Sequence, residues 1–357
     1  MNIKELLGEM VKRDASDLFY RAGGTARMRI DGKVIPIGDS VLSVADVIKA
    51  VEDLTKPEQR EKFKTALDVD FALFLEEFHR RFRVSIFTQR NSPSIVIRNI
   101  RDFIADFQSL NLPVDVLQRL ALETRGLVLL TGSVGSGKST TIASMIEYIN
   151  QNCNKHILTI EEPIEFTFKD KKGLINQRDL GLDVTSYAQA LRAFTLQSPD
   201  VIYIGNIRDH ETMSAALTAA ETGVLVLSTL HTINAPQTIE RIINFFPPHQ
   251  HQEIRIQLSF LLKGVVSLRL IPLKNSTGRV PAYEAMVLTP TVSRLIREGK
   301  SWEIHKFIDD GEVFGMQSFS KSLVRLVNEG KISEEEAINA ADNREEFTLG
   351  LKGFHRR

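Results

Sequence analysis

The stretch that decides the fold is Gly132-Ser133-Val134-Gly135-Ser136-Gly137-Lys138-Ser139-Thr140. It matches the pattern G-x-x-x-x-G-K-[ST], and it stands between a short apolar run and a helical pattern that extends to about residue 150. Glycines let backbone N–H groups turn toward phosphate oxygens, and the following helix presents its positive end to the same anion. Lys138 is expected to reach the β- and γ-phosphates, and the Ser139 hydroxyl is expected to bind Mg²⁺. The stretch therefore predicts a nucleotide site.

From residue 116 onward, strands and helices alternate along the chain. Apolar strands that alternate with helices predict a mostly parallel sheet covered on both faces, so the fold class is α/β. Residues 234–357 read mainly as helices. The other expected elements are strands at 127–131, 156–160, 201–204 and 224–229, and helices at 186–197 and 209–221.

Polar residues follow three of these strands. In an open parallel sheet, ligands gather beyond the carboxyl ends of the strands. Carboxylates there can orient water or hold a metal, although a solvated acidic turn and a structural histidine remain the alternative interpretations. The candidate catalytic residues are Glu161, Glu165, Asn206 and His231, and the candidate metal ligands are Ser139 and Glu162.

The first hundred residues predict a separate, smaller α/β domain. Residues 27–36 alternate in polarity around Asp31-Gly32, which indicates a hairpin. Residues 43–66 are expected to be helical, starting near Ser43, and three strands are expected at 69–75, 82–89 and 94–100. We therefore expect a domain at 1–101, a linker at 102–115 and a second domain at 116–357.

Composition narrows the class of protein. The chain has 357 residues, with 45 Lys and Arg against 45 Asp and Glu, so it has no overall charge that would attract nucleic acid. The one cysteine, Cys153, excludes an intrachain disulfide and a cysteine zinc cluster. No apolar stretch approaches the roughly 18 residues that a membrane-spanning helix needs, so we expect a cytoplasmic protein.

Taken together, these segments resemble the secretion ATPase superfamily, and most closely the type IV pilus retraction ATPases of the PilT/PilU type. The resemblance covers nearly the whole chain. Besides the phosphate loop, it is carried by SDL (16–18), RFRVSIFTQR (81–90), TIEEPIEF (159–166), SPDVIYIG (198–205), IRD (207–209), LSTLHTINA (227–235), RIINFFP (241–247), SRLIREGK (293–300) and FGMQSF (314–319).

The resemblance implies a PAS-like N-terminal domain and a RecA-like P-loop ATPase domain with a helical C-terminal part. It further implies a homohexameric ring that binds ATP and Mg²⁺ between the two domains and powers pilus retraction and twitching motility. The implied partners are an inner-membrane platform protein at the pilus base and a paralogous retraction ATPase, with no nucleic acid. The implied location is the cytoplasmic side of the inner membrane.

The resemblance also assigns a role to arginines of the N-terminal domain, which in the family move onto the phosphates. Arginine suits this role because it makes bidentate contacts and keeps its charge. The alternative is ordinary charge on a strand surface. The matching residues are Arg81, Arg83, Arg90 and Arg98.

Three positions depart from the family pattern. The family has Glu where this chain has Asn206, Arg where it has Leu196, and Asp where it has Glu162. Asn206 can hydrogen-bond water, but it cannot act as a general base. We therefore expect good binding of Mg-ATP with weak turnover, either in a retraction motor or in an accessory ring subunit.

Two other classes of protein fit the sequence less well. In the superfamily that this chain resembles, pilus assembly ATPases and type II secretion ATPases usually carry a longer N-terminal region and a four-cysteine metal subdomain. The single cysteine of this chain argues against both of these classes. A RecA-like DNA motor is disfavoured by the neutral charge and by the lack of interleaved aromatic and basic residues.

Overall fold

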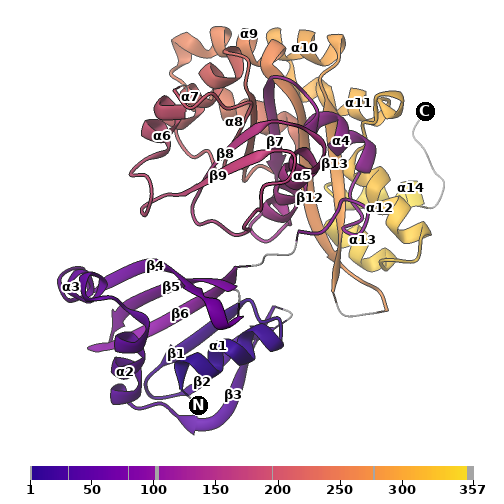
Figure 1. Cartoon of the computed structure of the whole chain (residues 1–357). Coiled ribbons are helices and arrows are strands. Elements are labelled where there is room, and N and C mark those ends of the chain that lie inside the picture. The colour runs from indigo at the N-terminus through magenta and orange to yellow at the C-terminus, as the bar shows by residue number, and fades with distance from the viewer. Residues whose placement is uncertain are drawn as a thin grey trace. The chain divides into compact units, whose positions relative to one another are not determined.

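The computed structural model describes residues 2–30, 32–78, 80–100, 104–194, 196–275 and 278–351. Contacts divide the chain into two compact units, coloured along the chain in Figure 1. The first comprises Met1–Phe103 with Glu165–Thr167, and the second comprises Ile104–Ile164 with Phe168–Arg357.

The first unit is an antiparallel sheet with helices packed on one face (Figure 1). The strand order is β3-β2-β1-β6-β5-β4, and every neighbouring pair is antiparallel. Its elements are α1 (Ile3–Lys12), β1 (Asp17–Arg21), β2 (Thr25–Ile30), β3 (Lys33–Val41), α2 (Val44–Leu54), α3 (Pro57–Ala66), β4 (Asp68–Leu75), the short 3₁₀ helix η1 (Glu76–Phe78), β5 (Arg80–Gln89) and β6 (Ser92–Ile100).

Alternation along the strands explains the core of this unit. Successive side chains of a strand point to opposite faces, so one set of apolar residues faces α1 and α2. Phe82, Val84 and Ile86 of β5 are completely buried in that layer. The expected hairpin is present, because Ile30 of β2 pairs with Lys33 of β3. Asp31 itself lies outside the described residues.

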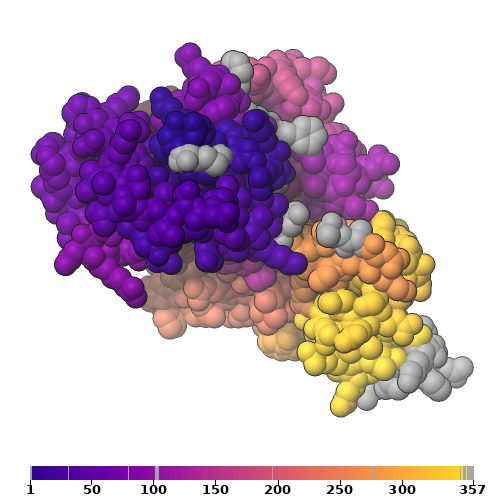
Figure 2. Space-filling model, turned by 90° about the horizontal axis from the view of Figure 1, so that it is seen from below, coloured from indigo at the N-terminus to yellow at the C-terminus, as the bar shows by residue number. Residues whose placement is uncertain are grey.

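The second unit is built on a larger sheet, and its C-terminal helices gather in one compact region of the surface (yellow in Figure 2). Its elements are α4 (Val114–Ala121), β7 (Gly126–Thr131), α5 (Lys138–Asn152), β8 (His156–Glu161), β9 (Leu174–Asp179), α6 (Tyr187–Phe194), β10 (Val201–Ile204), α7 (His210–Glu221), β11 (Leu225–Leu230), α8 (Ala235–Ile243), η2 (Pro248–Gln250), α9 (His251–Leu261), β12 (Leu262–Pro272), β13 (Arg279–Val287), α10 (Pro290–Arg297), η3 (Ser301–Glu303), α11 (Ile304–Asp309), η4 (Glu312–Phe314), α12 (Phe319–Asn328), α13 (Glu334–Ala340) and α14 (Arg344–Leu351).

Strand order in this sheet is β13-β12-β7-β11-β10-β8-β9. All neighbours are parallel except β12 and β13, which form an antiparallel pair. Helices cover both faces of the sheet. One hydrophobic cluster lies between the sheet and helices α4 and α5, and another lies between the sheet and helices α6 to α10. The fold class is therefore α/β with two sheets, as the alternation of elements predicts.

Two expectations about secondary structure are confirmed in outline but lack detail. The helical region expected at 43–66 is divided into two helices, because the chain leaves the helical conformation at Thr55 and Pro57 begins α3. The region from 234 onward is mainly helical, but it also contains β12 and β13, which add two unexpected strands to the sheet. Among the described residues, none of the helices is both long and apolar enough to cross a lipid bilayer.

Candidate functional site

The predicted phosphate loop has the backbone that its glycines allow. Gly132 has a φ of +138°, Gly135 of +77° and Gly137 of +97°, all in the region that favours glycine. Gly137 is the N-cap of α5, a helix of 15 residues. The positive end of α5 therefore opens directly onto the loop, as an anion site requires.

Strand β12 supports the loop from behind. A Cβ atom added to Gly132 would lie 2.4 Å from the backbone oxygen of Leu268 and 2.6 Å from Ser136 Oγ. Both distances are far below van der Waals contact, so only glycine fits between the loop and β12. A Cβ atom at Gly135 would meet nothing within 4 Å.

We expect Gly132→Ala to disrupt this loop. Contact with a backbone oxygen together with a φ that alanine avoids should cost about 2 to 4 kcal/mol. Gly135→Ala is the matched control, because it carries only the cost of positive φ, about 1 kcal/mol. Thermal unfolding and ATP calorimetry check this prediction, and equal losses in the two variants would contradict it.

The loop also carries buried polar groups that suit a phosphate. Lys138 is 8% exposed, and its Nζ donates to the backbone oxygens of Gly132 at 2.7 Å and Ser133 at 2.8 Å. Ser136 Oγ is buried without a hydrogen-bond partner among the described residues. A cation at the loop, a hydroxyl without a hydrogen-bond partner and a helix N-terminus can together bind the phosphates of a nucleoside triphosphate.

Asn206 and His231 lie together at the carboxyl ends of β10 and β11. Asn206 Nδ2 is 3.1 Å from His231 Nε2, and Asn206 Oδ1 is buried without a partner among the described residues. Burial and then the positive charges of Lys138 and Arg208 lower the pKa of His231. The lowered pKa favours the neutral imidazole, whose Nε2 can accept a hydrogen bond from the Asn206 amide.

Glu161 is held within the sheet. It is 6% exposed, and its Oε1 accepts from Thr159 Oγ1 at 2.7 Å and from Gln177 Nε2 at 3.1 Å. These bonds satisfy a buried carboxylate and fix its orientation. Glu161 can orient a neighbouring group, but much of its hydrogen-bonding capacity is already used.

Glu162 and Ser139 are the expected metal ligands. Glu162 Oε2 pairs with Arg208 Nη1 at 3.2 Å, and Ser139 lies in the first turn of α5, half-buried. Among the described residues, no group of three or more His, Cys, Asp or Glu could hold a metal ion. Mg²⁺ in nucleotide enzymes is usually bound by one or two side chains together with phosphates and waters, so a hydroxyl and a carboxylate suit it chemically, and the roles of Ser139 and Glu162 stay predictions. When bound, Mg²⁺ neutralises charge on the phosphates.

Glu165 does not group with the other candidates. Its short segment, Glu165–Thr167, belongs by contacts to the first unit, whereas Glu161 and Glu162 belong to the second. Its role as a candidate catalytic residue therefore stays a prediction.

Three of the four candidate arginines share the open face of the first sheet. Arg83 of β5 is the register partner of Arg98 of β6, and Arg81 lies two residues from Arg83 on the same face. Arg90 is exposed in the turn after β5, at the other end of the hairpin. The sheet thus brings Arg81, Arg83 and Arg98 together and leaves Arg90 apart.

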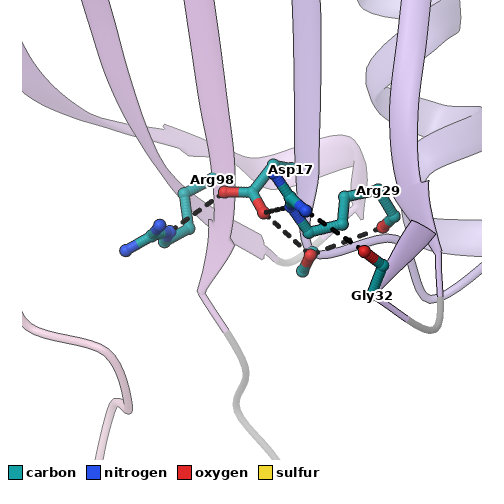
Figure 3. Close-up of polar contacts among 5 residues, drawn as sticks. Asp17, Arg29, Gly32 and Arg98 are labelled. Carbon is teal, nitrogen blue, oxygen red and sulfur yellow. Dashed lines mark hydrogen bonds and ion pairs between the residues drawn. The ribbon is translucent and has the colours of Figure 1, made fainter. Parts of the chain in front are cut away.

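Arg98 is held by a carboxylate on its neighbouring strand (Figure 3). Asp17, which is 6% exposed, pairs through Oδ1 with Arg98 Nε at 3.1 Å and through Oδ2 with Arg29 Nε at 3.2 Å. This contact leaves the two terminal nitrogens of Arg98 without a hydrogen-bond partner among the described residues. Arg83 is held more loosely, with Nη2 3.5 Å from Asp70 Oδ2.

Several residues near the site were not predicted from the sequence. Gln177 lies on β9, a strand that the polar sequence at 174–179 does not predict, and Arg208 belongs to the segment IRD (207–209), in which no residue was assigned a role. Tyr187 has a buried hydroxyl with no partner in the described part of the chain, and burial, then Glu162, raises its pKa. Of these three residues, only Arg208 could have been found from the sequence, because it lies two residues after the candidate residue Asn206.

Comparison with known proteins gives consistent matches over nearly the whole chain. The family model described as "Type II/IV secretion system protein" matches residues 1–339. "Type IV pilus ATPase PilU" of Pseudomonas aeruginosa is 39% identical over 352 residues, covering 99% of this chain and 92% of that protein. "Type IV pilus retractation ATPase PilT" of the same organism is 41% identical over 347 residues, covering 97% and 100%.

A solved structure matches the fold with the same extent. The crystal structure of the pilus retraction motor PilT with bound ADP has a TM-score of 0.89 and 41% identity, covering 97% of this chain and 98% of that chain. The identities to PilU and PilT are nearly equal, so they do not separate the two branches.

Proposed function

Because the chain belongs to the Type II/IV secretion system protein family, we propose that it is an ATP-dependent motor of type IV pilus retraction. The observation that carries this proposal is the phosphate loop. Its three glycines with positive φ lead into α5, and the first residue of α5 is the buried Lys138. PilT, 41% identical and described as a retraction motor, was solved with bound ADP, which supports the same substrate here.

Each part of the site has a defined task in this proposal. Backbone N–H groups of the loop and the end of α5 bind the phosphates of ATP, and Lys138 adds positive charge where negative charge develops. Ser139 and Glu162 hold Mg²⁺. Asn206 orients the attacking water through Oδ1, the atom without a protein partner among the described residues.

The amide at position 206 favours a second form of the same function. An amide has no basic oxygen to take a proton, so turnover is slow where a carboxylate would speed it. A subunit that binds ATP firmly and hydrolyses it slowly suits an accessory ring beside a paralogous retraction ATPase. We place both forms in a homohexamer on the cytoplasmic side of the inner membrane, bound to a platform protein at the pilus base.

One sample tests the proposal. Calorimetry of the purified chain with Mg-ATP should show saturable binding, and its mass in solution with Mg-ATP should equal six chains. Phosphate release separates the two forms, since an accessory subunit releases little. A ring that gives no calorimetric signal with adenine nucleotides would overturn the proposal.

A further inference from the structure

A buried carboxylate lies outside the groups used so far. Glu284 is in the middle of β13 and is 6% exposed. Its Oε1 accepts from the backbone N–H of Ala235, the first residue of α8, at 2.7 Å. The two residues are 49 positions apart in the sequence, so this bond ties the last strand of the sheet to the start of a distant helix.

The start of α8 continues directly from the site. His231 follows β11, and only three residues separate it from Ala235. Within that segment, Asn234 caps α8 by accepting from Gln237 N at 3.0 Å, and Thr232 Oγ1 is 2.7 Å from Thr238 Oγ1. The segment that carries His231 is thus fixed to the first turn of α8.

The strand under this turn leads to the phosphate loop. Ser267 of β12 is the register partner of both Glu284 on β13 and Thr131 on β7. Thr131 Oγ1 donates to Ser267 Oγ at 2.8 Å, and Thr131 immediately precedes Gly132. A row of three buried polar side chains therefore runs across the sheet one residue below the loop.

We propose that Glu284 is a positioning residue of the ATP site, whose carboxylate fixes the first turn of α8 and through it the segment 231–234 that holds His231 against Asn206. A carboxylate at a helix N-terminus is stabilised by the helix dipole, so it orders that turn more firmly than a neutral acceptor does. The inference rests on the proposed function, because it assigns Glu284 to the ATP site.

The cost of keeping this carboxylate ionised supports a functional role. Burial raises the pKa of Glu284 to about 7 from 4.5, although the Ala235 N–H opposes the rise. Asp342 and Asp309 raise the pKa further, and Arg269 of β12 lowers it. Because the folded pKa lies above the unfolded one, Glu284 favours folding fully below about pH 4.5, and that contribution is lost as the pH rises through about 7.

Glu284→Gln separates positioning from simple stabilisation. The side-chain amide oxygen of this variant can still accept from Ala235, but the charge is removed. At pH 8 the melting temperature should rise by about 3 °C or more, with no gain at pH 5. Phosphate release at pH 8 should nevertheless fall about fivefold with unchanged ATP affinity, because the turn beside His231 is less firmly held.

The pH profile gives the second readout. We expect turnover of the unmodified chain to rise as the pH passes through about 7, and Glu284→Gln to lack that rise. Glu329→Gln, the same change at an exposed residue that pairs with Lys331, is the control and should behave like the unmodified chain.

Hydrogen exchange of the amides at 235–238 needs no nucleotide. Exchange should be about fivefold faster in Glu284→Gln at pH 8. Unchanged exchange, or stability and turnover that fall together, would overturn the inference. Faster exchange in a chain that fails to bind ATP would leave the positioning of α8 intact and overturn the proposed function alone.

Discussion

Lys138→Ala should weaken ATP binding at least a hundredfold. Lys138 Nζ lies against the loop, bonded to two backbone oxygens that flank the expected position of the phosphates. Its removal takes away the one side-chain cation of the loop sequence and the hydrogen bonds that it donates to phosphate oxygens. Charge-assisted contacts in a site this buried are each worth about 1.5 to 3 kcal/mol, and more where charge develops in the transition state. Calorimetry with Mg-ATP measures the loss of affinity.

The control for this variant is Lys155→Ala. Lys155 is half-buried in the second unit, and its Nζ donates to the backbone oxygen of Glu123 at 3.2 Å. Lys155→Ala therefore removes the same kind of side chain and a similar hydrogen bond but leaves the phosphate loop unchanged. Both variants should keep the melting temperature within a few degrees of the unmodified chain. ATP affinity in Lys138→Ala equal to that of Lys155→Ala would contradict our account of the loop.

The sequence predicts the central part of the fold because local and tertiary signals agree there. Strands β7, β10 and β11 are buried on both faces, so each contains an uninterrupted apolar run of three or four residues. Helix α7 begins where Asp209 accepts from Thr212 N at 2.8 Å, as expected for an N-cap. The loop between β7 and α5 follows from its glycines.

The hairpin β12–β13 could not be predicted in the same way. Helix α9 ends at Leu261 and β12 begins at Leu262, with no glycine or proline between them. An apolar run without such a break does not distinguish a strand from a buried helix. Only the pairing of β12 with β7 decides between them, and this pairing is a tertiary contact.

The candidate site also has one part that the sequence predicts and another part that it does not. The phosphate-loop pattern predicts Lys138, and Glu161 and His231 are predicted because each lies at or next to the end of a strand. The bond from Gln177 to Glu161 and the contact of Glu284 with α8 join residues that are far apart in the sequence, and one partner of each lies on a strand that was not predicted. Their roles come from how the sheet assembles, and a motif does not encode this. The arginines of the first unit remain predictions for the same reason.

Asn206→Glu should raise turnover by about a hundred- to ten-thousandfold. The substitution places a carboxylate beside His231, where Asn206 Oδ1 now lies buried without a partner among the described residues. The positive charges that lower the pKa of His231, those of Lys138 and Arg208, will keep that carboxylate ionised. It can then accept a proton from the attacking water, which the amide cannot. Steady-state phosphate release measures the gain.

Asn206→Gln is the matched control for this gain. Gln has the length of Glu but no charge, so it should turn over no faster than the unmodified chain. If Asn206→Glu is no faster than Asn206→Gln, the missing carboxylate does not limit turnover, and the deficit moves to Leu196. That side chain is 88% exposed, where the family pattern has Arg, so Leu196→Arg would restore a charge without disturbing the core. A gain in Leu196→Arg alone would place the limiting step at the end of α6, whereas a gain in Asn206→Glu alone places it at His231.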